Sequence, residues 1–152
     1  MTASSSRAVH RHAALRRSGL ALGLAVIVIA LGLGMRFYGR GLGVPAFAVK
    51  YGGSVLWATM VYVLLAAFAP RLRPLRVAAI ALAIAVVVEL VRLVHTPWLD
   101  SFRLTLAGAL LLGRIFSVWN IVAYAMGITL GVVVDCGIGS IRGYEKFVRG
   151  DG

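Results

Sequence analysis

The stretch that decides the fold is Leu75–Val94, which reads LRVAAIALAIAVVVELVRLV. The uncharged run Val77–Val88 leads directly into Glu89, and Arg92 follows three residues later. An apolar segment of about twenty residues is long enough to cross a bilayer as a helix. A carboxylate at membrane depth costs about 2.5–3.5 kcal/mol on insertion scales, so it marks a candidate functional site. The segment therefore predicts a membrane-spanning helix that carries such a site.

The composition of the whole chain is that of an integral membrane protein. Of the 152 residues, 61% are hydrophobic and 14% are charged, whereas soluble domains carry about 25% charged residues. The formal net charge of +11 could indicate nucleic-acid binding. The basic residues flank the apolar runs, however, as the positive-inside rule and lipid headgroups would place them. We therefore expect membrane lipids, and no nucleic acid, as partners.

The apolar runs predict an all-α integral membrane bundle of four transmembrane helices, over residues 18–35, 51–70, 75–94 and 115–134. Pro97 is expected to end the third span, because proline lacks the N–H that a helix needs. Asp100 or Ser101 is then a candidate N-cap for the next segment. The apolar segment Leu104–Gly113 is only about half a membrane thickness long as a helix. It predicts a short re-entrant or interfacial half-helix, the alternative being a fourth helix that begins early.

Polar segments flank the predicted transmembrane domain, residues 18–134. Residues 1–17 are rich in arginine and contain no acid, which predicts a disordered cytoplasmic tail. A signal peptide is the competing interpretation, although the apolar core that follows is longer than usual. Residues 135–152 are mixed in charge, and an interfacial helix and a frayed tail both fit them. The basic residues of the short loops favour both termini in the cytoplasm.

Small residues indicate where helices can approach closely. Ala123, Gly127 and Gly131 recur at every fourth position of the last span, and Gly19 and Gly23 do so in the first. Lipid gives little hydrophobic drive for helix association, so close packing through small residues matters in a membrane. We expect these faces to pack helices within the chain, with a homo-oligomer through the same faces as the alternative.

Five polar residues are candidates for a ligand or headgroup pocket at one membrane face: Glu89, Arg92, Asp100, Arg103 and Asn120. Glu89 and Arg92 share a helix face, so a local ion pair is the structural alternative to a ligand site. A buried Asn120 needs a partner, and Glu89 or Arg92 on a neighbouring helix is the natural one. Because arginine binds phosphate well, the expected ligand is an anionic headgroup.

The signals for catalysis and for metal binding are weaker. Glu89 is the candidate catalytic residue, as a general base assisted by His95 or Asp100. His95 lies six residues further on, about 120° round a helix from Glu89. The sequence contains neither an H-E-x-x-H pattern nor a cysteine pair, so we expect no metal and no other cofactor.

Several short motifs occur in a characteristic order. They are KYGGSVLW at Lys50–Trp57, ELVR at Glu89–Arg92, HTPWLD at His95–Asp100, LG at Leu112–Gly113 and YAMG at Tyr124–Gly127. This set resembles domain-of-unknown-function family 2809, small bacterial membrane proteins that are similar to the VanZ-like family, over roughly residues 20–134. The resemblance implies a helical membrane protein with a role in the cell envelope, and no established chemistry.

The chain departs from that family's pattern at three positions. Ser54 and Asn120 stand where the pattern has acids, and Arg92 stands where it commonly has glutamine. These replacements disfavour a metal site or a proton relay that needs an acid cluster. We therefore expect a binding or accessory protein of the cell envelope. The alternatives are a membrane enzyme acting on lipid-linked substrates and a small transporter subunit.

Overall fold

In the computed structural model, the described part of the chain, residues 3–113 and 116–149, contains helices and no strand. The helices are α1 (Ala3–Tyr38), α2 (Ala46–Phe68), α3 (Pro74–Val91), α4 (Pro97–Leu104), α5 (Leu106–Leu111) and α6 (Val118–Arg149). Four stretches are long and apolar enough to span a membrane, namely Ser18–Tyr38, Ala46–Phe68, Pro74–Val91 and Val118–Gly137. The predicted four-span, all-α architecture is confirmed.

The helices at the two ends of the chain are longer than expected. The segment 1–17 was expected to be disordered, but α1 begins at Ala3 and runs unbroken into the first span. Likewise α6 continues from the last span to Arg149, so residues 135–149 extend that helix and do not begin a new one. Extending an existing helix by one residue costs far less than nucleating a new one, and no proline interrupts either segment.

The third span ends earlier than expected, and Pro97 is not what ends it. α3 ends at Val91, and Pro97 occupies the first position of α4 instead of ending α3. Proline is favoured there because the first N–H groups of a helix have no intrahelical acceptor. Thr96 takes the N-cap position, and Asp100 lies inside the first turn of α4. The expectation that Asp100 or Ser101 caps this helix was therefore wrong.

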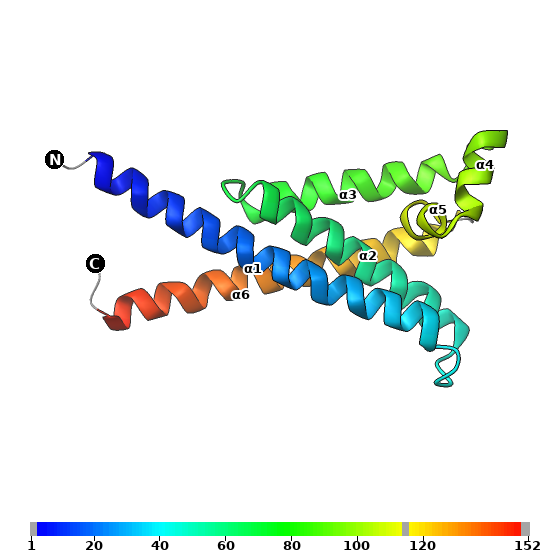
Figure 1. Ribbon diagram of the computed structural model, residues 1–152, viewed down its shortest axis with the longest axis horizontal. Coiled ribbons are helices and arrows are strands. Elements are labelled where there is room, and N and C mark those ends of the chain that lie inside the picture. The colour runs from blue at the N-terminus through cyan, green and yellow to red at the C-terminus, as the bar shows by residue number, and fades with distance from the viewer. Residues whose placement is uncertain (1–2, 114–115, 150–152) are drawn as a thin grey trace.

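The segment expected to form one half-helix, 104–113, is divided at Thr105. Leu104 ends α4, and α5 occupies Leu106–Leu111. The Thr105 hydroxyl caps α5 by accepting a hydrogen bond from the Gly108 N–H at 3.0 Å. α4 and α5 lie together at the end of the bundle where α3 ends and α6 begins (Figure 1). One end of the bundle therefore carries α4 and α5, and the opposite end carries the short α2–α3 turn.

The α2 helix occupies the centre of the bundle and packs against α1, α3 and α6, while α3 also packs against α6. The buried core along α2 consists of small residues and tyrosine, including Ala58, Tyr62 and Ala66. Large aliphatic side chains such as Val26 and Leu130 point outward instead. Small residues inside and large apolar residues outside are the pattern expected of helices packed in lipid.

The helices α2 and α6 approach each other closely. A Cβ on Gly127 would overlap the Val55 carbonyl, and a Cβ on Gly131 would lie 2.6 Å from the Tyr62 ring. The Thr59 hydroxyl donates to the Gly127 carbonyl at 2.9 Å, which ties the two backbones together. Ala123, the third member of this row, is 4% exposed. The row therefore packs α6 on α2 within one chain.

The corresponding pair in α1 is placed differently. A Cβ on Gly19 or Gly23 would meet no atom within 4 Å. This part of α1 contacts α2 through other residues, since Ser18 donates to the Ala67 carbonyl at 2.7 Å and Ala25 is buried in the core. The two glycines face away from that contact, so the structure does not use them for packing within the chain.

The two glycine sets give a matched comparison of stability. We expect Gly127→Ala to lower the free energy of unfolding in detergent by about 1–3 kcal/mol, because the added methyl forces the helices apart. Gly23→Ala is the control, and should be neutral or stabilising by up to about 1 kcal/mol, since alanine favours a helix. Equal effects of the two substitutions would contradict the α2–α6 contact.

Candidate functional site

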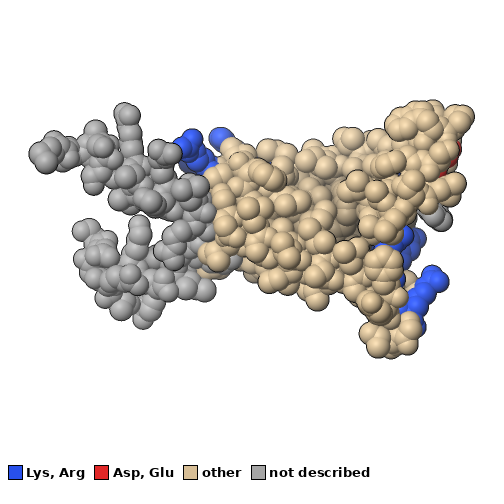
Figure 2. Space-filling view, viewed as in Figure 1, with Lys and Arg blue, Asp and Glu red and all other residues tan. Residues whose placement is uncertain are grey.

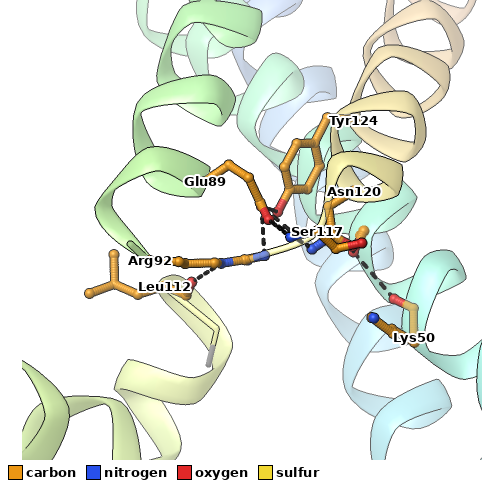
Figure 3. A network of polar contacts seen from close by, with 8 residues as sticks. Lys50, Glu89, Arg92, Leu112, Ser117, Asn120 and Tyr124 are labelled. Carbon is orange, nitrogen blue, oxygen red and sulfur yellow. Dashed lines mark hydrogen bonds and ion pairs between the residues drawn. The ribbon is translucent and has the colours of Figure 1, made fainter. Parts of the chain in front are cut away.

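The Glu89 carboxylate is fully buried near the end of α3 and accepts hydrogen bonds on both oxygens (Figure 3). Its Oε1 accepts from the Ser117 backbone N–H at 2.7 Å and from Asn120 Nδ2 at 3.2 Å. Its Oε2 accepts from Arg92 Nη1 at 2.6 Å and from the Tyr124 hydroxyl at 2.8 Å. A buried carboxylate is tolerable only when it is paired and hydrogen-bonded in this way. We call these five residues the Glu89 cluster.

Local sequence explains how α6 supplies most of the donors. Asn120 and Tyr124 are four residues apart, so both project from the same helix face. Ser117 immediately precedes α6, and the first N–H groups of a helix lack intrahelical acceptors. The N-terminal end of a helix also favours a negative charge through the helix dipole. Glu89 therefore lies where both the hydrogen bonds and the field of α6 stabilise it.

Arg92 connects the cluster to the segment that follows α5. Its side chain is 10% exposed, and its Nε donates to the Leu112 carbonyl while Nη1 pairs with Glu89. Gly113 lies directly against the guanidinium with φ +69°, and a Cβ there would come within 2.6 Å of Nη2. Both the left-handed backbone and the close approach require glycine at this position. The ion pair expected between Glu89 and Arg92 is present. The Arg92 side chain also binds the Leu112 carbonyl just after α5.

Asn120 extends the network to α2. Its Nδ2 faces the Glu89 carboxylate, and its Oδ1 lies 3.3 Å from the Ser54 hydroxyl, the donor. The same hydroxyl lies 3.3 Å from the Lys50 carbonyl, so its single proton serves one acceptor at a time. The expected partnership of Asn120 with Glu89 is therefore present, and the network joins α2, α3 and α6.

Asp100 and Arg103 form a second, separate cluster. The Arg103 side chain is 4% exposed and donates to the carbonyls of Val91 at 2.6 Å and Val94 at 2.9 Å. Val91 is the last residue of α3 and Val94 lies in the turn that follows, where the helix dipole favours a cation. Arg103 also pairs with Asp100 at 2.8 Å, and Asp100 lies 3.3 Å from His95 Nδ1. Neither His95 nor Asp100 contacts Glu89 in the described hydrogen bonds.

The structure thus divides the five-residue pocket that the sequence suggested. Glu89, Arg92 and Asn120 lie together, whereas Asp100 and Arg103 close the end of α3. Sequence reasoning missed Tyr124 as a member of the cluster. Its position four residues after Asn120 was the available signal. The other missed partners are backbone atoms, which carry no residue-type signature.

The contacts of the Glu89 carboxylate limit the chemistry that it can perform. Within the described residues, no group of three or more His, Cys, Asp or Glu side chains could hold a metal ion. A general base needs an oxygen that can reach the substrate proton. Both oxygens of Glu89 face protein donors from α3, α6 and the segment between α5 and α6. Substrate could reach this carboxylate only if at least one of these hydrogen bonds were given up.

Four apolar helices of spanning length, with one charged cluster inside the bundle, define a multi-pass helical membrane protein. A family model described as "Protein of unknown function (DUF2809)" matches residues 44–128, which is more than half of the chain. The chain belongs to the DUF2809 family. The matched region begins just before α2 and contains the whole Glu89 cluster and the Arg103 cluster. No solved structure matches the chain.

Removing one partner of the buried ion pair should be costly. We expect Glu89→Gln to lower the free energy of unfolding in detergent by about 3–5 kcal/mol, because it leaves the Arg92 charge buried without its counter-ion. The double variant Glu89→Gln/Arg92→Gln should lose less than the sum of the two single variants.

Asp100→Asn is the control for this cycle, because it removes an acid whose side chain is 45% exposed. Its partner Arg103 is buried but keeps its hydrogen bonds to the Val91 and Val94 carbonyls, so we expect Asp100→Asn to cost less than Glu89→Gln. A Glu89→Gln variant as stable as the Asp100→Asn variant, or strictly additive single variants, would contradict the coupling described above.

Proposed function

We propose that this protein is a binding or accessory protein of the bacterial cell envelope, and that the Glu89 cluster holds the ligand-facing end of the bundle in a fixed shape. The observation that carries the proposal is the complete engagement of the Glu89 carboxylate by Ser117, Asn120, Arg92 and Tyr124. A fully bonded carboxylate suits a positioning role, because its geometry is determined from several helices at once. The cluster lies at the end of the bundle that carries α4 and α5 (Figure 1), and we place the ligand against that end.

The same contacts weigh against the two alternatives. An enzyme acting on lipid-linked substrates would use Glu89 as a base, and the carboxylate would first have to release Tyr124 or Ser117. A transporter subunit would use Glu89 as a carrier site, which must bind and release its ion. His95 and Asp100, the expected assistants, contact each other and not Glu89. The binding role is therefore the better supported proposal.

The orientation that fits this proposal places both termini in the cytoplasm of the bacterial inner membrane. α1 begins and α6 ends at one end of the bundle, which also carries the α2–α3 turn (Figure 1). That turn contains Arg71 and Arg73, Arg76 follows in the first turn of α3, and the segment 1–17 adds further arginines. Basic residues concentrate on the cytoplasmic side of membrane proteins. The Glu89 cluster then faces the outer side of the membrane.

Reporter fusions test this orientation. A fluorescent protein that matures only in the cytoplasm should be bright when fused after residue 152. Alkaline phosphatase, which is active only outside the cytoplasm, should be active when inserted after Gly41. The opposite pattern at both positions would overturn the orientation.

Native mass spectrometry of the purified full chain tests the binding role. Released from a mild detergent micelle, the wild-type protein should carry a bound lipid or other small molecule, and Glu89→Gln should carry less. The control is Thr129→Val, which changes an exposed residue that hydrogen-bonds only within α6. A wild-type spectrum showing the bare polypeptide alone would refute the binding role.

A further inference from the structure

Three exposed cations lie at the same end of the bundle as the Glu89 cluster. Arg36 is in the last turn of α1, Arg40 is in the α1–α2 connection and Lys50 is near the start of α2. Lys and Arg side chains show at this end of the molecule in the space-filling view (Figure 2). The sequence analysis used these residues only to count charges for topology. We call them the α1–α2 cations.

The charge of the α1–α2 cations is not balanced by the acids whose side chains the structure describes. Glu89 is paired with Arg92, Asp100 is paired with Arg103, and Asp135 accepts from the Tyr62 hydroxyl. The described contact of Lys50 Nζ is with the Tyr51 ring, at 5.1 Å from its centroid. This end of the bundle therefore presents positive charge toward whatever lies outside it.

The connection that carries these cations is folded and not a loose loop. Its turn is closed by hydrogen bonds from the Val44 N–H to the Gly39 carbonyl at 2.9 Å and from the Gly43 N–H to the Arg40 carbonyl at 3.2 Å. Gly39 is buried, and a Cβ there would overlap the Met35 carbonyl and lie 3.1 Å from Val49 Cγ2. Arg40 is thus held within a fixed turn, which reduces the ordering cost of binding.

Apolar side chains in the same connection indicate what lies against it. Phe37, Tyr38, Leu42 and Phe47 are all more than half exposed, and Leu42 is 80% exposed. Aromatic residues beside cations at the end of a span are typical of the boundary between hydrocarbon and headgroups. The groups found at that depth are lipid phosphates. A free phosphate ion has no apolar part to lie against these side chains, whereas a phospholipid has its acyl chains.

We propose that the α1–α2 cations bind the phosphate of an anionic phospholipid, whose acyl chains lie along the exposed apolar side chains of the same connection. The inference rests on the proposed binding function and names the ligand class. It also moves the contact away from Arg92 and Arg103, the arginines that the sequence favoured. Their guanidinium groups already donate to Glu89, to Asp100 and to backbone carbonyls.

The α2–α3 turn offers a matched control for the experiment. Arg71, Arg73 and Arg76 are exposed, equal in number to the α1–α2 cations, and located at the opposite end of the bundle. General attraction between a basic protein and anionic lipid would involve both sets equally. Binding at a specific site would depend on the α1–α2 cations and not on the arginines at the opposite end.

The test is lipid binding by the full chain in nanodiscs that contain phosphatidylcholine with a minor fraction of phosphatidylglycerol. Native mass spectrometry then measures which lipids remain bound. The wild-type protein should be enriched in phosphatidylglycerol. The variant Arg36→Gln/Arg40→Gln/Lys50→Gln should bind it about a hundredfold more weakly, since each cation near an anionic surface contributes about fivefold. The variant Arg71→Gln/Arg73→Gln/Arg76→Gln should keep the enrichment.

Two further measurements separate binding from folding and from charge at large. Both triple variants should unfold at the wild-type temperature in pure phosphatidylcholine, because none of the six side chains is in a described ion pair. The charge-conserving variant Arg36→Lys/Arg40→Lys/Lys50→Arg should retain most of the enrichment. Inorganic phosphate at millimolar concentration should not displace the lipid.

The contrary results are distinct. Equal loss in both glutamine variants, loss in neither, or displacement by inorganic phosphate would overturn the inference. A wild-type protein that retains another ligand with no preference for phosphatidylglycerol would overturn the inference and leave the proposed binding function standing. A wild-type protein that retains no ligand would overturn both.

Discussion

The rest of this structure depends on the burial of one carboxylate. Glu89 is fully buried at the end of a membrane-spanning helix, where an unpaired charge would cost several kcal/mol. Its oxygens are satisfied by Arg92, by two side chains of α6 and by the Ser117 N–H that precedes α6. The last of these donors fixes where α6 can begin. The segment between α5 and α6 must therefore return to the end of α3, and Arg92 holds it there through the Leu112 carbonyl.

The same constraint connects the cluster to the packing of the bundle. Asn120 can present its Nδ2 to Glu89 only with its Oδ1 toward Ser54 on α2, so the two helices are aligned in rotation. Two turns further along α6, Gly127 meets the backbone of α2 and accepts from Thr59. In lipid, where burial of apolar surface gives no drive, such polar ties and close backbone contacts are what hold helices together. The polar cluster and the glycine row thus act on one interface.

The features of the fold and site that could be predicted from sequence are those that depend on local interactions. The four spans were predictable because hydropathy averages over many residues, and the pairing of Glu89 with Arg92 follows from helical spacing alone. The partnership with Asn120 required only that a buried amide find a charged neighbour. The N–H of Ser117 and the carbonyl of Leu112 could not be predicted, because any residue type supplies them. Arg103 was assigned to a ligand pocket because its acceptors are likewise backbone carbonyls, those of Val91 and Val94.

Residue type alone therefore does not identify the arginines that meet a ligand in a membrane protein. Arg92 and Arg103 are the arginines that the sequence placed in the candidate pocket, and the guanidinium groups of both are engaged by other groups of the protein. Arg36 lies in the last turn of α1 and Arg40 in the connection that follows, and their charges stay outside every described ion pair. A guanidinium that satisfies a helix end or a buried acid has already used the donors that phosphate would need. The positive charge left after the internal acids are matched is the part that can act on the lipid, and the α1–α2 cations carry the share of it that lies at the same end of the bundle as the Glu89 cluster.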